Sequence, residues 1–326
     1  MNKTIFCEIS PFGLGDRLLD ILGLRVIMKL LNIDEAMISW RNDMGRYCNR
    51  ELIDFISLNM RICQKENVQN KNNILRTICS VTLSPYNIWM LKPSVGINEI
   101  IQLYIETAKD IEKCLQIDRL VPDYINNCIG IHMRRTDKIL QSPQSTHEMN
   151  YEEYHIMHER LLKHITKLIK DQSKEQSLHF YLCSDDLPYK QILANKIKNI
   201  ALENEKEIII HKTDPHIFQE NQSEYDLYEM LCLFKCKEIL QGTKYSTYST
   251  FASLMSQKPI YNFSDHASIS SMYAWKPCLN LFLSDGDNIV QYDHDINIAE
   301  MKQSVADTWG DIKLVPANIY SVSPSS

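Results

Sequence analysis

The chain has 326 residues, 44% of them hydrophobic and 23% charged, which excludes an intrinsically disordered protein and leaves room for two domains. The formal net charge is -6 and no basic stripe is present, so a nucleic-acid partner is not expected. No apolar run reaches the roughly 18 residues that a membrane span requires, and no span is predicted.

The cysteines indicate a reducing environment. None of the ten forms a Cys-x-x-Cys pair, so zinc-ribbon and thioredoxin-type sites have no support. Several lie inside apolar runs, such as Cys128 and Cys183, which favours buried free thiols. Cys232 and Cys236 are four residues apart and are assigned to the core rather than to a metal. Because the first residues also lack the apolar stretch of a secretory signal, we expect a cytoplasmic protein.

The opening of the chain has the pattern of a parallel α/β unit. An apolar run at residues 5–9 predicts a strand that ends at a turn containing Gly13-Leu14-Gly15-Asp16. Apolar residues then recur at helical spacing over 17–31, and residues 36–40 predict a second strand. Strand, glycine-rich turn, helix and strand are the usual start of such a unit.

The middle of the chain is expected to be mostly helical, over residues 50–125, with an amphipathic helix at 97–114. The pattern breaks around Val121-Pro122-Asp123. We place a domain boundary there, between an N-terminal α/β domain of residues 1–124 and a C-terminal domain of residues 125–326.

The second half again alternates strands with helices. Strands are expected at 128–133, 179–183, 207–211, 238–241 and 259–263, and helices at 151–170, 189–203, 225–237 and from 251. Polar clusters follow three strands, at 132–138, 184–186 and 243–250. Open α/β sheets bind ligands at the carboxyl ends of their strands, so we expect these clusters to converge on one edge.

The cluster at 132–138 has the strongest chemical signal, because two arginines, a lysine and a histidine follow an apolar strand in an acidic chain. Arginine presents a planar fork that matches phosphate oxygens, and fixed arginines can stabilise a departing diphosphate. The structural alternative is a surface salt bridge between Arg135 and Asp137.

The other clusters permit two interpretations each. The glycines at 13 and 15 let a backbone approach an anionic ligand at a helix start, or form a tight turn. Asp185 and Asp186 could accept hydrogen bonds from a nucleoside or cap the following helix. The hydroxyl-rich run at 243–250 could form a phosphate cradle or an ordinary capped loop.

Two acidic patterns, Asp285-Gly286-Asp287 and Asp293-His294-Asp295, could hold a divalent cation on a nucleotide diphosphate. Three-residue acidic patterns are common by chance, and these two lie after the α/β alternation ends. No metal is therefore predicted.

Three segments of the chain resemble parts of one enzyme family. The run His132-Met133-Arg134-Arg135-Thr136-Asp137-Lys138 resembles the H-x-R-R-T-D-K motif of the α-1,6-fucosyltransferases, which are grouped with nodulation, protein O- and α-1,2-fucosyltransferases. Gly13-Leu14-Gly15-Asp16 followed by Ile38-Ser39-Trp40-Arg41 is similar to the start of the nodulation enzymes. Residues 229–236 and then 246–252 resemble their acidic helix and Ser/Thr cradle.

The resemblance implies a GT-B architecture, with two Rossmann-like domains facing a central cleft. It also implies transfer of fucose from GDP-fucose to a glycan acceptor, with inversion and without a metal. The domain of residues 1–124 would face the acceptor, and that of residues 125–326 would bind the nucleotide sugar, its tail packing back on the first domain. Two alternatives stay open on the same scaffold: a rhamnose, xylose or galactose donor, or a protein that binds a nucleotide or glycan without catalysis.

The resemblance also assigns roles to matching residues. Arg134 would hold the β-phosphate, and His132 would line the donor site. Further donor contacts are implied for Gly13, Leu14, Gly15, Arg135, Asp185, Asp186, Ser246, Thr247, Ser249 and Thr250. The family often has Asp where this chain has Glu229, so the catalytic carboxylate is either Glu229 or Asp226, one helical turn earlier.

Overall fold

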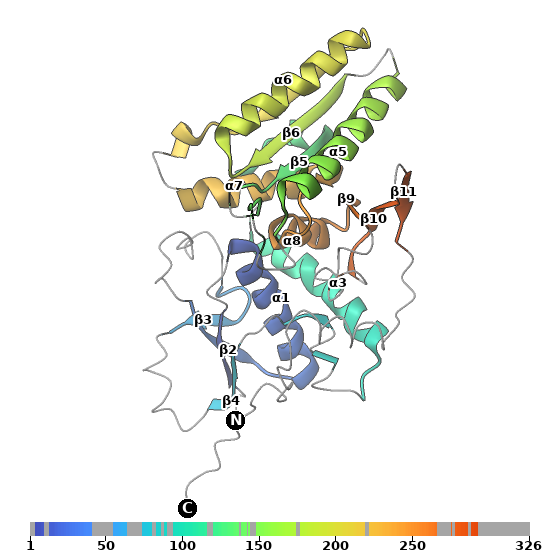
Figure 1. Ribbon diagram of the computed structural model, residues 1–326. Helices are drawn as coiled ribbons and strands as arrows, with labels where there is room; N and C mark the ends of the chain where they lie inside the picture. The colour runs from blue at the N-terminus through green and yellow to red at the C-terminus, as the bar shows by residue number, and fades with distance from the viewer. Residues whose placement is uncertain are drawn as a thin grey trace, which may run out of the picture.

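The computed structural model describes residues 4–9, 13–40, 55–63, 74–79, 83–85, 88–89, 94–115, 120–136, 138–141, 143, 148–173, 177–218, 222–265, 275, 278–285 and 288–292. Within these ranges the chain forms two β-sheets, one of four strands and one of seven. Figure 1 shows them in two halves of the molecule, each with its own helices.

The first sheet is entirely parallel. Its strands are β1 (Thr4–Glu8), β2 (Glu35–Ser39), β3 (Met60–Ile62) and β4 (Ile74–Cys79), in the order β3-β2-β1-β4. Helix α1 (Leu14–Leu31) connects β1 to β2, and α3 (Ile97–Cys114) follows the sheet. Residues 5–7 form an uninterrupted apolar run because β1 is a central strand, buried on both faces.

The middle of the chain differs in part from the expectation of mostly helical structure. The helix predicted at 97–114 is confirmed, but β3 and β4 are strands that the sequence did not indicate. Both are short, and a run of three to six residues cannot show whether its apolar positions repeat every two residues or every 3.6.

The second sheet is parallel except at one edge. Its strands are β5 (Cys128–Met133), β6 (Leu178–Ser184), β7 (Ile208–Lys212), β8 (Glu238–Gln241), β9 (Ile260–Asp265), β10 (Leu281–Asp285) and β11 (Asn288–Gln291). They lie in the order β11-β10-β9-β8-β5-β6-β7, and β11 runs antiparallel to β10. Counted from β5 as the first strand, the order is that of the dinucleotide-binding fold. The prediction of two Rossmann-like units is confirmed.

Helices cover both faces of the second sheet. One face carries α5 (Tyr151–Asp171) and α6 (Leu187–Glu203), and the other carries α7 (Gln222–Lys235) and α8 (Thr247–Ser256). Two short 3₁₀ helices are η3 (Asp123–Asn127) and η4 (Pro215–Phe218). A single core cluster joins the α7 and α8 face to the first unit, and α1 and α3 both pack on α8 (Figure 1). The junction between the units is therefore apolar packing around α8.

Three further expectations concern the termini, the membrane and the thiols. The predicted boundary between residues 124 and 125 falls within η3, between the two sheets, and stays a prediction; the tail lies outside the described residues. None of the described helices is both long and apolar enough to cross a membrane. Eight cysteines whose side chains the structure describes are free thiols, and Cys128, Cys183, Cys232 and Cys236 are buried, as expected for core residues.

Candidate functional site

The three polar clusters predicted from sequence meet at the carboxyl edge of the second sheet. His132 in β5 lies opposite Cys183 in β6 and Gln241 in β8, so the ends of these neighbouring strands are level. The segments that follow the strands then touch one another: the backbone nitrogen of Arg135 donates to Asp185 at 2.8 Å, and His132 Nδ1 lies 3.0 Å from Ser249 Oγ. The expected convergence is confirmed.

Two helix N-termini from different units also meet at this edge. Gly13 precedes α1 without a side-chain cap, and Ser246 precedes α8 without one. A Cβ placed on Gly15 would lie 2.5 Å from the backbone nitrogen of Tyr248, so the first turns of α1 and α8 are in backbone contact. Each helix start carries about half a positive charge from its aligned peptide dipoles. The two together make this junction suited to an anion.

Arg134 adds a full positive charge at the same junction. It directly follows β5, and its Nη1 lies 4.0 Å from the position that a Cβ on Gly13 would occupy. It is half-buried, and burial raises the pKa of the nearby Asp16 carboxyl while the charge of Arg134 opposes the rise. The residue that the sequence assigned to a phosphate therefore lies beside the start of α1.

Gly15 has a role that the sequence did not specify. The sequence motif suggested that Gly15 lets a ligand approach the backbone. In the structure, the backbone of Thr247 and Tyr248 approaches it closely. This contact by itself requires glycine, because any side chain would collide with α8. Contact of Gly13, Leu14 or Gly15 with a donor stays a prediction.

Several hydroxyls around the start of α8 are buried without a partner. The Oγ atoms are those of Thr243, Ser246 and Thr250. Buried polar groups in folded proteins are almost always hydrogen-bonded, so each such group calls for an explanation. Their position beside two helix N-termini and an arginine is consistent with groups that a bound ligand would satisfy.

His132 lies next to the first turn of α8. Its ring is buried, stacks on Tyr248 with ring centroids 5.1 Å apart, and contacts Ser249, whose Oγ also accepts from Gln241 Nε2 at 2.7 Å. Burial and then the charge of Arg134 lower its pKa to about 3. The imidazole is therefore neutral at pH 7 and acts as a hydrogen-bonding group rather than a cation.

The remaining residues of the cluster hold the loop after β5 in place. Arg135 donates to Asp186 at 2.8 Å, and its guanidinium lies 3.9 Å from the ring centre of Tyr189. Asp185 accepts from the backbone nitrogens of Arg135 and Thr136. Asp186 also caps α6 by accepting from the nitrogen of Tyr189 at 2.9 Å, which confirms the capping interpretation. Donor contacts of these residues stay predictions.

In the structural alternative Arg135 would pair with Asp137, which lies outside the described residues; the partner observed is Asp186. The two acidic patterns at 285–287 and 293–295, which the sequence offered as cation sites, also fall largely outside the described residues. Asp285 ends β10, just before the chain enters β11, whereas residues 286–287 and 293–295 fall outside the described part of the chain.

Asp16 is a site residue to which the sequence assigned no role. It lies in the first turn of α1 and forms a side-chain hydrogen bond with Thr247 at the start of α8. Burial raises the pKa of its carboxyl, while Thr247, Arg134 and Lys138 act in the opposite direction. Its place in the Gly13–Asp16 run was visible in the sequence, but its partner came from the other unit.

Glu229, one of the two predicted catalytic carboxylates, is locked in an ion pair. Its Oε1 accepts from Lys190 Nζ, and the two side chains are each 3% exposed. Lys190 also donates to the hydroxyl of Tyr225 at 2.7 Å, and Tyr181 donates to Glu229 at 3.5 Å. Burial raises the pKa of Glu229, and Lys190 partly offsets this. The carboxylate ties α6, α7 and β6 together.

Asp226, the alternative carboxylate, is half-buried and lies one helical turn closer to the start of α7. The backbone carbonyl oxygen of Asp226 accepts a hydrogen bond from the hydroxyl of Tyr248, whose ring stacks on His132. Asp226 is thereby connected to the residues at the carboxyl edge, and it has more access to solvent than Glu229.

Comparisons with known proteins give distant likenesses. No protein-family profile and no curated protein sequence matches the chain. Among solved structures, NodZ α-1,6-fucosyltransferase co-crystallized with GDP is similar with a TM-score of 0.46 and 12% identity, over 91% of this chain and 100% of that one. Fucosyltransferase NodZ from Bradyrhizobium gives 0.45 and 11%, over 90% and 99%.

A mutant of Arabidopsis thaliana FUT1 in complex with GDP is similar with a TM-score of 0.45 and 12% identity, over 87% of this chain and 70% of that one. At such identities the functional residues of this chain have to be established from its own contacts.

Proposed function

We propose that this protein is a glycosyltransferase that moves fucose from GDP-fucose to a hydroxyl of a glycan acceptor, with inversion at the anomeric carbon and with no metal on the diphosphate. The observation that carries the proposal is the position of Arg134, which leaves β5 beside the uncapped N-termini of α1 and α8.

A departing diphosphate needs fixed positive charge, and this junction supplies it from three sources. Helix N-termini offer backbone N–H donors and a positive dipole end, and arginine binds phosphate oxygens through a planar fork. Such preorganised groups stabilise the charge that develops as the bond to the sugar breaks. The same task falls to a divalent cation in metal-dependent transferases, so these residues support chemistry without one.

The unpartnered hydroxyls supply the second part of the argument. Thr243, Ser246 and Thr250 are buried around the start of α8 with no hydrogen-bond partner. A phosphate or ribose oxygen would satisfy them. The phosphate-binding geometry alone does not specify the sugar or the base of the donor. We choose GDP-fucose because residues 132–138 resemble the fucosyltransferase motif.

The reaction is a single displacement. An acceptor hydroxyl attacks C1 of fucose from the face opposite the diphosphate, the C1–O bond breaks, and GDP leaves with the bonding electrons while a carboxylate accepts the hydroxyl proton. We assign the carboxylate to Asp226, because it is half-buried and its backbone carbonyl oxygen accepts from Tyr248, which stacks on His132. Glu229 is a positioning residue, because its ion pair with buried Lys190 occupies it.

The experiment is a donor assay on the full chain combined with a nucleotide panel. GDP is expected to raise the melting temperature and UDP is not, and GDP-fucose is expected to be hydrolysed slowly or transferred to glycan acceptors. Preference for UDP would replace fucose with another donor class. Tight binding of GDP with neither hydrolysis nor transfer would identify a non-catalytic nucleotide-binding protein.

A further inference from the structure

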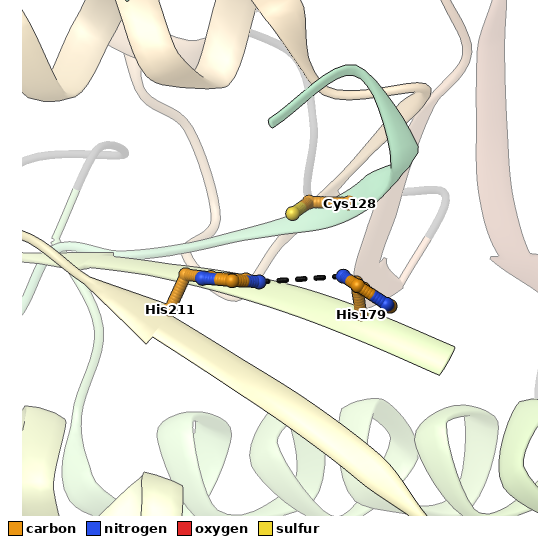
Figure 2. Close-up of side chains that lie close together, drawn as sticks. All are labelled: Cys128, His179 and His211. Atoms are coloured by element: carbon orange, nitrogen blue, oxygen red, sulfur yellow. Dashed lines mark hydrogen bonds between the residues drawn. The ribbon is translucent and has the colours of Figure 1, made fainter. Parts of the chain in front are cut away.

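A cluster of metal-ligating side chains lies at the amino edge of the second sheet, away from the proposed donor site. Cys128 is the first residue of β5, His179 is the second of β6, and His211 is near the end of β7. Their ligand atoms all lie within 4.8 Å of one another (Figure 2). Among the described residues, this is the group of three such side chains that could hold a metal ion.

The register of the strands brings the three together on one face. Cys128 lies opposite His179, and His211 lies opposite Tyr181, which is two residues after His179. Side chains two apart in a strand share a face, so all three project to the side of the sheet that α7 covers. Figure 2 shows the Cys128 sulfur near the two imidazoles, whose ring nitrogens face each other.

The spacing of the two imidazoles is that of a tetrahedral zinc site. His179 Nδ1 and His211 Nε2 are 3.3 Å apart, with ring planes 29° apart. Two nitrogens bonded to one Zn²⁺ at about 2.0–2.1 Å in tetrahedral geometry are separated by about 3.3–3.4 Å. A thiolate sulfur at about 2.3 Å from the same ion lies about 3.5 Å from each nitrogen, so the Cys128 side chain needs to move by about 1 Å.

We propose that Cys128, His179 and His211 form a Zn²⁺ site that fastens the amino ends of β5 and β6 to β7. Thiolate and imidazole ligands select zinc and similar transition metals over Mg²⁺ and Ca²⁺, which prefer oxygen. Binding replaces the thiol proton: the S–H bond breaks, a Zn–S bond forms, and the proton is released to solvent.

Burial and access fit such a site. Cys128 is buried, while both histidines are half-buried, so an ion reaches the cluster from the side of the histidines. The ring of Tyr124 in η3, which is 49% exposed, stacks on His211 with centroids 4.7 Å apart and so packs on one face of the imidazole. With three protein ligands, the fourth position is open to water.

In the absence of a metal the same groups satisfy one another only weakly. The two imidazoles share one hydrogen bond, and the thiol of Cys128 donates to the carbonyl oxygen of Tyr124 at 3.6 Å. Burial raises the pKa of this thiol to about 11, although Lys237 acts against the rise. The ordinary alternative is therefore a histidine pair next to a core cysteine, and the experiment has to separate it from a metal site.

The zinc site is independent of the proposed transfer reaction. Cys128 and His132 are four residues apart in one strand, which corresponds to about 13 Å at the usual rise of β-structure. An ion at Cys128 does not reach a diphosphate beside Arg134. Its effect is on the second sheet and on η3, which precedes β5.

The test is metal binding by the chelator-treated full chain. Zn²⁺ is titrated against a chromogenic chelator, and Co²⁺ is used as a spectroscopic substitute. One equivalent of Zn²⁺ is expected, a Co²⁺ complex shows a thiolate charge-transfer band, and Zn²⁺ but not Mg²⁺ raises the melting temperature. Loss of one ligand, in Cys128→Ser or His179→Gln, weakens Zn²⁺ binding by about 100-fold or more, and Cys128→Ser also abolishes the band.

Two variants serve as controls. Cys63→Ser removes a half-buried thiol elsewhere, and His155→Gln removes an exposed histidine, so both retain the stoichiometry and the band. His179→Gln, on the partly exposed side, keeps the test open if Cys128→Ser fails to fold. The proposal is overturned if the folded chain binds no Zn²⁺, or if Cys128→Ser and His179→Gln bind it with unchanged affinity.

Discussion

Gly15 in α1 and Tyr248 in α8 bring the two units of the chain into backbone contact. A Cβ on Gly15 would lie 2.5 Å from the Tyr248 nitrogen and 2.6 Å from the carbonyl carbon of Thr247. The side-chain hydrogen bond between Asp16 and Thr247 fastens the same point. Because Tyr248 also stacks on His132, the contact between the units is continuous with the proposed donor site.

Gly15→Ala is expected to destabilise the protein and to weaken GDP binding together. The added methyl meets backbone that cannot rotate away, so the first turn of α1 has to move, at a cost of about 1–3 kcal/mol. Urea unfolding and a GDP titration measure the two effects. Gly96→Ala is the matched control, because Gly96 also precedes a helix and its Cβ would meet nothing within 4 Å. Unchanged GDP affinity in Gly15→Ala would separate this junction from the donor site.

Arg134→Ala is expected to lower turnover with GDP-fucose by about 100-fold or more, as is typical when a group that stabilises transition-state charge is lost. Arg134→Lys should recover part of the rate, since it restores the charge but not the fork. Arg135→Ala is the contrasting variant. Arg135 binds Asp186 and lies against Tyr189, so its removal should mainly lower the unfolding free energy. Steady-state kinetics beside urea unfolding distinguish the two, and equal turnover in Arg134→Ala and wild type would refute the role.

Glu229 and Asp226 should respond differently to loss of charge. Glu229→Gln leaves the buried Lys190 ammonium without its partner and is expected to cost about 3–5 kcal/mol of stability. Adding Lys190→Met to Glu229→Gln should recover much of this loss. Asp226→Asn should fold normally and lose turnover. If Glu229→Gln combined with Lys190→Met were stable but inactive, and Asp226→Asn fully active, the two assignments would be exchanged.

His132 should make the protein sensitive to acid. Its pKa in the folded chain is about 3, below the ordinary 6.5, so between these values the unfolded chain binds a proton that the folded chain does not. Stability therefore falls as the pH is lowered through this range, and one such group contributes about 2 kcal/mol between pH 7 and pH 5. Urea unfolding of the wild type and of His132→Asn at both pH values gives the contribution by difference. An identical pH dependence in both proteins would show that His132 is not buried as described.

The sequence was most informative where a pattern is long or an element is wholly apolar. The bounds of β5, β8 and α3 were predicted as observed, because β5 is a mostly apolar run, β8 has an apolar centre at Ile239 and Leu240, and α3 has a helical repeat. The start of α8 was placed at residue 251 and lies at Thr247, since the hydroxyl-rich residues before it look like a loop. Strands β10 and β11 were missed because the pair is short.

Contacts between distant segments were the part that sequence reasoning could not supply. The pairing of Asp16 with Thr247, the ion pair of Glu229 with Lys190 and the gathering of Cys128 with two histidines all depend on strand order and register. The cysteine and histidines have no local spacing motif. Their only signal is that Cys128 and His179 both lie at the start of neighbouring strands, which becomes meaningful once the register is known.

The buried hydroxyls of the α8 region should have opposite effects on the free protein and on its complex. Thr250→Val removes a fully buried oxygen that has no partner while keeping the shape of the side chain, so the free protein is expected to gain about 1 kcal/mol of stability. If that oxygen binds a phosphate or ribose, the same change weakens GDP binding. Thr107→Val is a close control, because Thr107 in α3 is also fully buried with an unpartnered Oγ but lies outside the three polar clusters. It should stabilise the free protein and leave GDP affinity unchanged. Calorimetric titration with GDP and urea unfolding measure both quantities, and an equal GDP affinity in the two valine variants would remove Thr250 from the donor site.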